Sequence, residues 1–98
     1  MKQVALDPYV TDVLMRDLVG HDRMPSAFIV YLWLWRMGRG DGRERVGASL
    51  QSLATRTGLS KSAVQKAAAH LARRRLVTAT RAHATDAPTY EVHQPWLR

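Results

Sequence analysis

The order of apolar and polar residues predicts a helix near the start of the chain. One set of apolar residues recurs three or four positions apart, the spacing of one helix face: Val10, Val13, Leu14 and Leu18. Asp7 and Pro8 precede this set and favour a helix start, because Asp caps free N–H groups and Pro fits the first turn. Gly20 then predicts a helix end near residue 19.

A second stretch, residues 26–37, is apolar on every side and predicts a buried helix that stops at Gly38. Its aromatic residues are Phe28, Tyr31, Trp33 and Trp35. A helix with no polar face must be covered all round. We therefore expect it either at the centre of the domain or with one face against another subunit.

The second half of the chain predicts two short helices and a β-hairpin. The expected elements are a strand at 45–47, helices at 49–57 and 60–74, strands at 76–80 and 89–92, and a loop at 81–88. Together with the earlier helices, this pattern predicts a mostly α chain with a small antiparallel β-hairpin. The expected fold class is α+β, in one domain over residues 1–98.

Each residue at the junction of the two short helices suits a tight helix–turn–helix. Ala54 is small enough for a close helix crossing, and Gly58 can take a left-handed backbone at the turn. Leu59 can plug the turn into the core, and Ser60 can cap the next helix. The apolar residues that would anchor that second helix are Val64 and Leu71.

With the hairpin that follows, residues 46–92 resemble a winged helix-turn-helix domain. The likeness is greatest to bacterial modules that begin with Ser-Leu-x-x-Leu-Ala, here residues 49–54, in transcription regulators and in plasmid or phage replication initiators. The resemblance implies a helix-turn-helix at about 49–74 and a wing hairpin at about 76–92. It also implies that the helix at 60–74 enters the major groove while the wing touches the backbone or minor groove.

Two positions depart from that family's pattern. Arg75 stands where a glycine commonly ends the recognition helix, and a left-handed arginine costs about 1 kcal/mol. A regular helix end and a displaced start of the wing are therefore expected. Ala68, next to Ala67, replaces the usual large aliphatic residue. The space that this leaves is expected to be filled by one of three aromatic residues: Phe28, Trp33 or Trp35.

Positive charge is concentrated in one part of the chain. Lys and Arg number 15 against 8 Asp and Glu, giving a formal charge of +7. No acidic residue lies within residues 45–85, and that stretch alone carries +8. Such asymmetry is typical of a surface that binds a polyanion, although a solvated basic face without a partner has the same composition.

Helical periodicity then selects the residues that would face DNA. With Val64 inward and 100° per residue, the opposite side of the helix carries Ser62, Lys66, Ala69 and Arg73, flanked by Gln65. Gln65 can read adenine with two hydrogen bonds, or it can be ordinary helix surface. Lys66 and Arg73 can bind either guanine or phosphate. The predicted phosphate contacts are Ser49, Thr55, Arg56, Lys61, Arg74, Arg75, Arg81 and His83.

Other chemistry finds little support in the sequence. The chain has no Cys, and its four His residues lack metal-ligand spacing, so we expect neither disulfides nor a metal site. No phosphate-binding loop, carboxylate pair or nucleophile–base motif predicts an enzyme, and no cofactor is expected. No apolar run is long enough to span a membrane and no signal peptide is evident, which predicts a cytoplasmic protein.

Three functional hypotheses remain at this point. The first is a transcriptional regulator that binds specific double-stranded DNA, for which a homodimer through Phe28, Leu32 and Trp35 is expected. The second is a protein-interaction winged helix that binds no DNA and uses the apolar helix as its surface. The third is the DNA-binding module of a replication or plasmid-maintenance initiator, which the sequence does not separate from a regulator.

Overall fold

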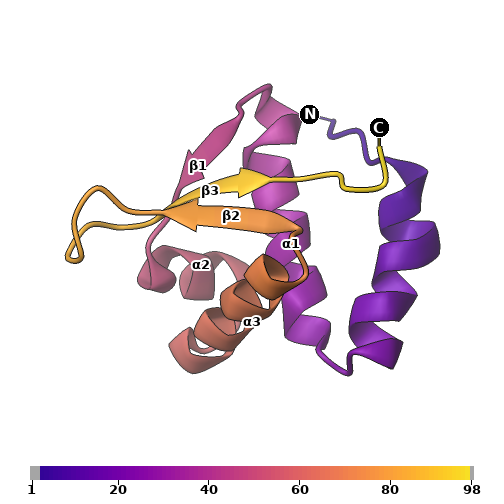
Figure 1. Ribbon diagram of the computed structural model, residues 1–98, viewed down its shortest axis with the longest axis horizontal. Helices are drawn as coiled ribbons and strands as arrows, with labels where there is room; N and C mark the ends of the chain where they lie inside the picture. The colour runs from indigo at the N-terminus through magenta and orange to yellow at the C-terminus, as the bar shows by residue number, and fades with distance from the viewer. Residues whose placement is uncertain (1–2, 98) are drawn as a thin grey trace.

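The computed structural model describes residues 3–97 and has an α+β fold (Figure 1). Within that range, four helical segments accompany a small three-stranded antiparallel sheet. After a helical segment at residues 8–21, the elements are α1 (Pro25–Met37), a 3-10 turn η3 (Arg39–Asp41), β1 (Arg45–Gly47), α2 (Leu50–Thr57), α3 (Lys61–Arg73), β2 (Val77–Thr80) and β3 (Thr89–Val92). The predicted fold class is thereby confirmed.

The N-terminal helical segment, residues 8–21, is wider than an α-helix over two stretches. Its two π-helical parts are η1 (Val10–Leu14) and η2 (Asp17–His21). The prediction that Gly20 ends this helix is wrong, because the wider turns carry that glycine inside η2. The chain instead leaves the helix after Asp22, where Arg23 has a left-handed φ of 54° and the Met24 N–H donates to the Leu18 carbonyl at 2.8 Å. The Asp7 cap is confirmed, since its Oδ1 accepts the Tyr9 N–H at 2.9 Å.

Helix α1 occupies the centre of the fold, which is one of the two arrangements expected from its sequence. It contacts the N-terminal segment, α2, α3 and β3, and its closest helix partner is α3 (Figure 1). The small side chain of Ala67 is fully buried on α3, which allows this close approach. Burial also raises the pKa of Tyr31 far above its usual value, so its hydroxyl keeps its proton and donates to the His93 carbonyl at 2.9 Å.

Helices α2 and α3 begin at the predicted Ser caps, and α2 ends at the predicted Gly58. The Ser49 hydroxyl accepts the Ser52 N–H at 3.0 Å, and the Ser60 hydroxyl accepts the Ala63 N–H at the same distance. Gly58 takes the left-handed conformation between the two helices, with φ of 80°. These local interactions fix the turn and set the direction in which α3 leaves it.

The sheet contains the predicted hairpin together with the strand expected at 45–47. Its order is β1-β3-β2, and both pairings are antiparallel. Val46 pairs with Tyr90, and Val77 with Val92, so these four buried side chains form the inner face of the sheet. Residues 81–88 connect β2 to β3 and project away from the helices (Figure 1). This projection places the loop beyond the body of the molecule.

The end of α3 differs from the expectation of a regular helix end with a displaced wing. Arg75 itself takes the left-handed backbone, with φ of 58°. The Arg75 N–H donates to Ala72 and the Leu76 N–H to Leu71, at 3.0 and 2.9 Å, a bonding pattern that normally uses glycine. Buried Leu76 and Leu71 meet at this turn and hold it, so packing overrides the backbone preference.

Replacing Arg75 with glycine should therefore stabilise the fold. Arg75→Gly removes the steric cost of the left-handed arginine, so we expect the free energy of unfolding to rise by about 0.5–1 kcal/mol. Chemical denaturation at neutral pH measures this change. Arg73→Gly, within the same helix at ordinary α geometry, should instead lower stability by about 1 kcal/mol. Equal effects of the two substitutions would contradict the assigned backbone geometry.

The two ends of the described chain are joined by contacts that the sequence analysis did not predict. Asp7 Oδ2 accepts hydrogen bonds from Gln94 Nε2 at 3.2 Å and from Trp96 Nε1 at 3.1 Å. The Trp96 ring stacks on Tyr9, with ring centroids 4.4 Å apart. These bonds, led by the Tyr9 N–H, lower the pKa of Asp7. The segment after β3 is thereby fastened to the start of the first helix (Figure 1).

Candidate nucleic-acid interface

Helix α3 separates apolar and polar residues as the periodicity predicts. Val64, Ala67 and Leu71 are fully buried against the core. On the opposite side, the side chains left exposed are Ser62, Gln65, Lys66, Ala69 and Arg73. A row of polar and cationic groups interrupted by one small residue therefore faces outward along the helix. Its contact with DNA stays a prediction.

The other predicted contact residues on the two short helices are also at the surface. Thr55, Arg56 and Lys61 are exposed, whereas Ser49 is half-buried and its hydroxyl is already used as the α2 cap. The Thr55 hydroxyl accepts from Gln51 Nε2 at 3.2 Å. Arg56 and Lys61 are thus exposed cations on α2 and at the start of α3.

The loop at residues 81–88 carries little charge, and two hydrogen bonds form within it. Arg81 Nη1 donates to the Ala84 carbonyl at 3.2 Å, and the Asp86 N–H donates to the His83 carbonyl at 3.0 Å. Arg81 and His83 are both exposed. The loop is therefore a small structured projection with one cation, and Asp86 opposes that charge.

The sequence analysis did not predict a cluster of charged side chains at the flank of α3, which is centred on the Asp22 carboxylate. Asp22 Oδ2 lies 2.7 Å from His70 Nε2 and 3.1 Å from Arg74 Nε, while its Oδ1 lies 2.8 Å from His21 Nδ1. The Asp22 side chain is only 7% exposed. Arg74, predicted as a phosphate contact, is therefore paired with this carboxylate. Its Nη2 also lies 3.9 Å from Asp17 Oδ2, a second and looser ion pair.

This cluster predicts a loss of stability in acid, below about pH 4. The hydrogen bond from His21, followed by that from His70 and the charge of Arg74, lowers the pKa of Asp22 below its usual 3.8. A lowered folded-state pKa stabilises the fold above about pH 4, and this contribution is lost as the pH falls through the folded value. Asp22→Asn should therefore flatten the decline of the thermal midpoint between about pH 5 and pH 3. Asp12→Asn, which removes an exposed carboxylate, is the matched control and should leave the decline nearly unchanged. An undiminished decline in Asp22→Asn would contradict this role.

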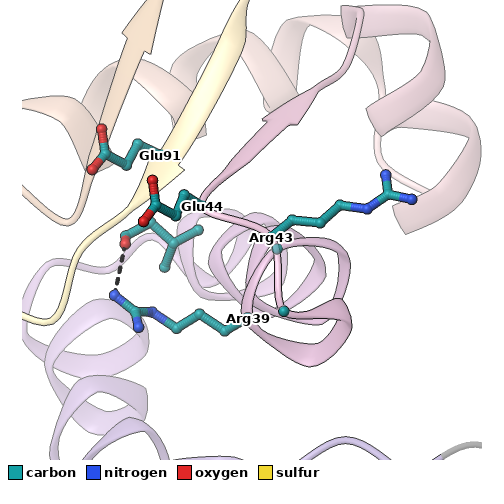
Figure 2. A pocket seen from close by; sticks show the side chains of 7 residues that line it. Arg39, Arg43, Glu44 and Glu91 are labelled. Carbon is teal, nitrogen blue, oxygen red and sulfur yellow. Dashed lines mark hydrogen bonds between the residues drawn. The ribbon is translucent and has the colours of Figure 1, made fainter.

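A cavity on the far side of the sheet offers no comparable constellation. It measures about 420 Å³ and is lined by Gly38, Arg39, Gly42, Arg43, Glu44, Glu91 and Val92. Arg39 donates to the Val92 carbonyl at 3.1 Å, and its guanidinium lies 5.5 Å from the centroid of the Trp35 ring. Figure 2 shows Arg43 pointing away from Glu44 and Glu91. Arg43 thus stands apart from the other charged groups that line this cavity.

The residues proposed for a dimer face are only partly available. Phe28 and Trp35 are 6% and 4% exposed, so the expectation that they offer contact area to a second subunit is wrong for these two. Leu32 is half-buried and lines an open hollow between α1 and α2, together with Ile29, Trp33, Arg56 and Thr57. Ile29 is 39% exposed. The remaining apolar surface of α1 is therefore centred on Ile29, Leu32 and Trp33.

Residues 3–97 lack two further features. They contain no group of three or more His, Asp or Glu side chains arranged to hold a metal ion. Nor do they contain a helix with the length and hydropathy needed to cross a bilayer. No protein-family model, curated protein or solved structure matches the chain.

Proposed function

We propose that this chain binds double-stranded DNA as a winged helix-turn-helix domain and acts as a transcriptional regulator. In this proposal α3 lies in the major groove and the loop at residues 81–88 is the wing. One observation carries the proposal: α3 exposes Lys66 and Arg73 on one side, within a 41-residue stretch, 45–85, that has no carboxylate. A segment that contains no acidic residue suits a phosphate backbone.

The small side chain at the middle of the exposed side supports a groove-binding role. An α-helix fits the major groove, which is about 12 Å wide, when its outward side chains leave room for base edges. Ala69 provides that room between Lys66 and Arg73 on α3. Gln65 is exposed beside them and can pair with adenine through its amide. Arg56 and Lys61 then bind phosphates at the groove edge, which sets affinity rather than sequence choice.

Gln65 provides the test of sequence-specific binding. Selection from a library of random duplexes should recover a preferred sequence for the unmodified chain. Gln65→Ala should lose discrimination at one base pair, by roughly 5- to 150-fold. Gln51→Ala removes an exposed amide on α2 and should leave the selected sequence unchanged. Recovery of no preferred sequence, or of the same sequence from Gln65→Ala, would contradict the assigned reading helix.

A second candidate function is a protein-interaction domain without DNA binding. The observation that favours it is the apolar hollow formed by Ile29, Leu32 and Trp33 between α1 and α2. The same surface serves the first proposal, where it would join two copies that read half-sites about one helical turn apart. The two functions differ in salt dependence, because only phosphate binding releases counterions.

A further inference from the structure

Asp22 is placed between the N-terminal helical segment and the flank of α3. One of its carboxylate oxygens, Oδ2, accepts a hydrogen bond from His70 Nε2 at 2.7 Å and forms an ion pair with Arg74, whose Nε lies 3.1 Å away. These two residues are four positions apart and so lie one turn apart on the same side of α3. Because the carboxylate is 7% exposed and is bonded through both oxygens, it is an anchor built into the fold rather than a loose surface pair.

The orientation of Arg74 in this anchor is informative. The guanidinium is paired with Asp22 at its Nε end, 3.1 Å away, and more loosely with Asp17, which lies 3.9 Å from Nη2 and beyond hydrogen-bond distance. Among residues 3–97, these two ion pairs leave the terminal nitrogens of Arg74 available as hydrogen-bond donors. The Arg74 side chain is 39% exposed. An arginine held at Nε presents its other donors in a fixed fork, which suits a phosphate oxygen.

We propose that Asp22 is a positioning residue for DNA binding, which holds Arg74 at Nε so that its terminal nitrogens bind a phosphate beside the major groove. The inference rests on the proposed function and adds a residue from outside the helix-turn-helix to it. Arg74 is displaced by about 100° around α3 from Arg73, the direction of the groove wall rather than of the bases. Asp22 and His70 do not touch DNA in this arrangement, and they act through Arg74.

The positioning role and simple electrostatics predict opposite changes in DNA affinity when Asp22 is replaced. The sign of that change therefore decides between them. Removing a carboxylate from a DNA-binding protein should strengthen binding, because repulsion of the phosphates decreases. If Asp22 positions Arg74, however, Asp22→Asn should weaken binding despite the gain in positive charge. Asp12→Asn removes the same charge from an exposed site on the same segment and serves as the control.

The experiment measures duplex affinity of the full chain by fluorescence anisotropy, at a temperature where every variant is folded. We expect Asp22→Asn to weaken binding roughly fivefold, and Asp12→Asn to leave it equal or slightly tighter. In an Arg74→Ala background, Asp22→Asn should have no further effect on affinity. Equal strengthening by both Asn variants would overturn the proposal. So would an unchanged loss in the Arg74→Ala background, since that loss would reflect a general structural role.

Arg74→Lys provides a second test that leaves the anchor carboxylate in place. Lysine keeps the charge but cannot bond Asp22 and a phosphate through separate ends of a planar fork. We expect roughly fivefold weaker binding, and binding equal to that of the parent would overturn the proposal. The double variant Lys66→Ala with Arg73→Ala distinguishes a failure of the positioning role from a failure of the proposed function. If that pair loses affinity while the Asp22 and Arg74 variants do not, only the positioning role fails. If the unmodified chain does not bind duplex, the proposed function fails as well.

Discussion

Removing both outward cations of α3 should weaken duplex binding roughly 100-fold at low salt. The change is Lys66→Ala with Arg73→Ala, and both side chains are exposed on the side of α3 that faces away from the core. If each cation binds a phosphate, each loss should also reduce the slope of log K against log salt by about 0.9. Titration of a labelled duplex at several salt concentrations measures both effects in one series.

The control for this pair removes equal charge from other elements. Arg16→Ala with Arg43→Ala lowers the net charge by the same amount, and both residues are exposed and lie outside α3. Arg43 points away from its neighbouring carboxylates (Figure 2). This second pair should weaken binding only slightly, through long-range attraction. Equal losses in the two pairs would mean that total charge, rather than the α3 surface, determines affinity.

Trp35→Ala should lower the free energy of unfolding by about 3–5 kcal/mol. The ring is 4% exposed, its Nε1 donates to the Ala5 carbonyl at 2.9 Å, and it lies 6.1 Å from Tyr31 between centroids. Truncation leaves a large cavity and an unpaired carbonyl in a domain whose total stability is of order 5–15 kcal/mol. Urea denaturation followed by circular dichroism measures the loss.

Two variants keep this prediction testable if Trp35→Ala does not fold. Trp35→Phe retains most of the ring but loses the Nε1 hydrogen bond, and it should cost about 1–2 kcal/mol. Trp33→Ala, which removes a half-buried ring at the open hollow, should cost about 1 kcal/mol. A larger loss of unfolding free energy from Trp33→Ala than from Trp35→Ala would contradict the assigned orientation of α1.

The two tryptophans also show why the face of α1 could not be predicted. The helix is apolar on every side, so its sequence has no periodic contrast that separates an inner from an outer ring. The amphipathic α3 does have that contrast, and its buried and exposed residues fall where the spacing places them. Its start was equally predictable, because Ser60 accepts a bond from an N–H only three residues away.

Contacts between distant parts of the chain had no such signal. Asp22 and His70 are separated by 48 residues, and Asp7 and Trp96 by 89. Neither pair belongs to a motif with fixed spacing, so only the packed fold brings them together. The π-helical turns that carry the first helix past Gly20 also go beyond local preference, since glycine alone favours a helix end. Arg75 likewise adopts a glycine-like backbone because Leu76 must reach the core.

The salt dependence of duplex binding by the unmodified chain tests the central claim most directly. With about four or five cations on phosphates, the association constant for a random duplex should fall with a log–log slope near −4. Such a slope requires direct contact between the basic surface and the phosphate backbone. An association constant that does not change with salt, or no binding at low salt, would contradict a role for this chain in binding DNA.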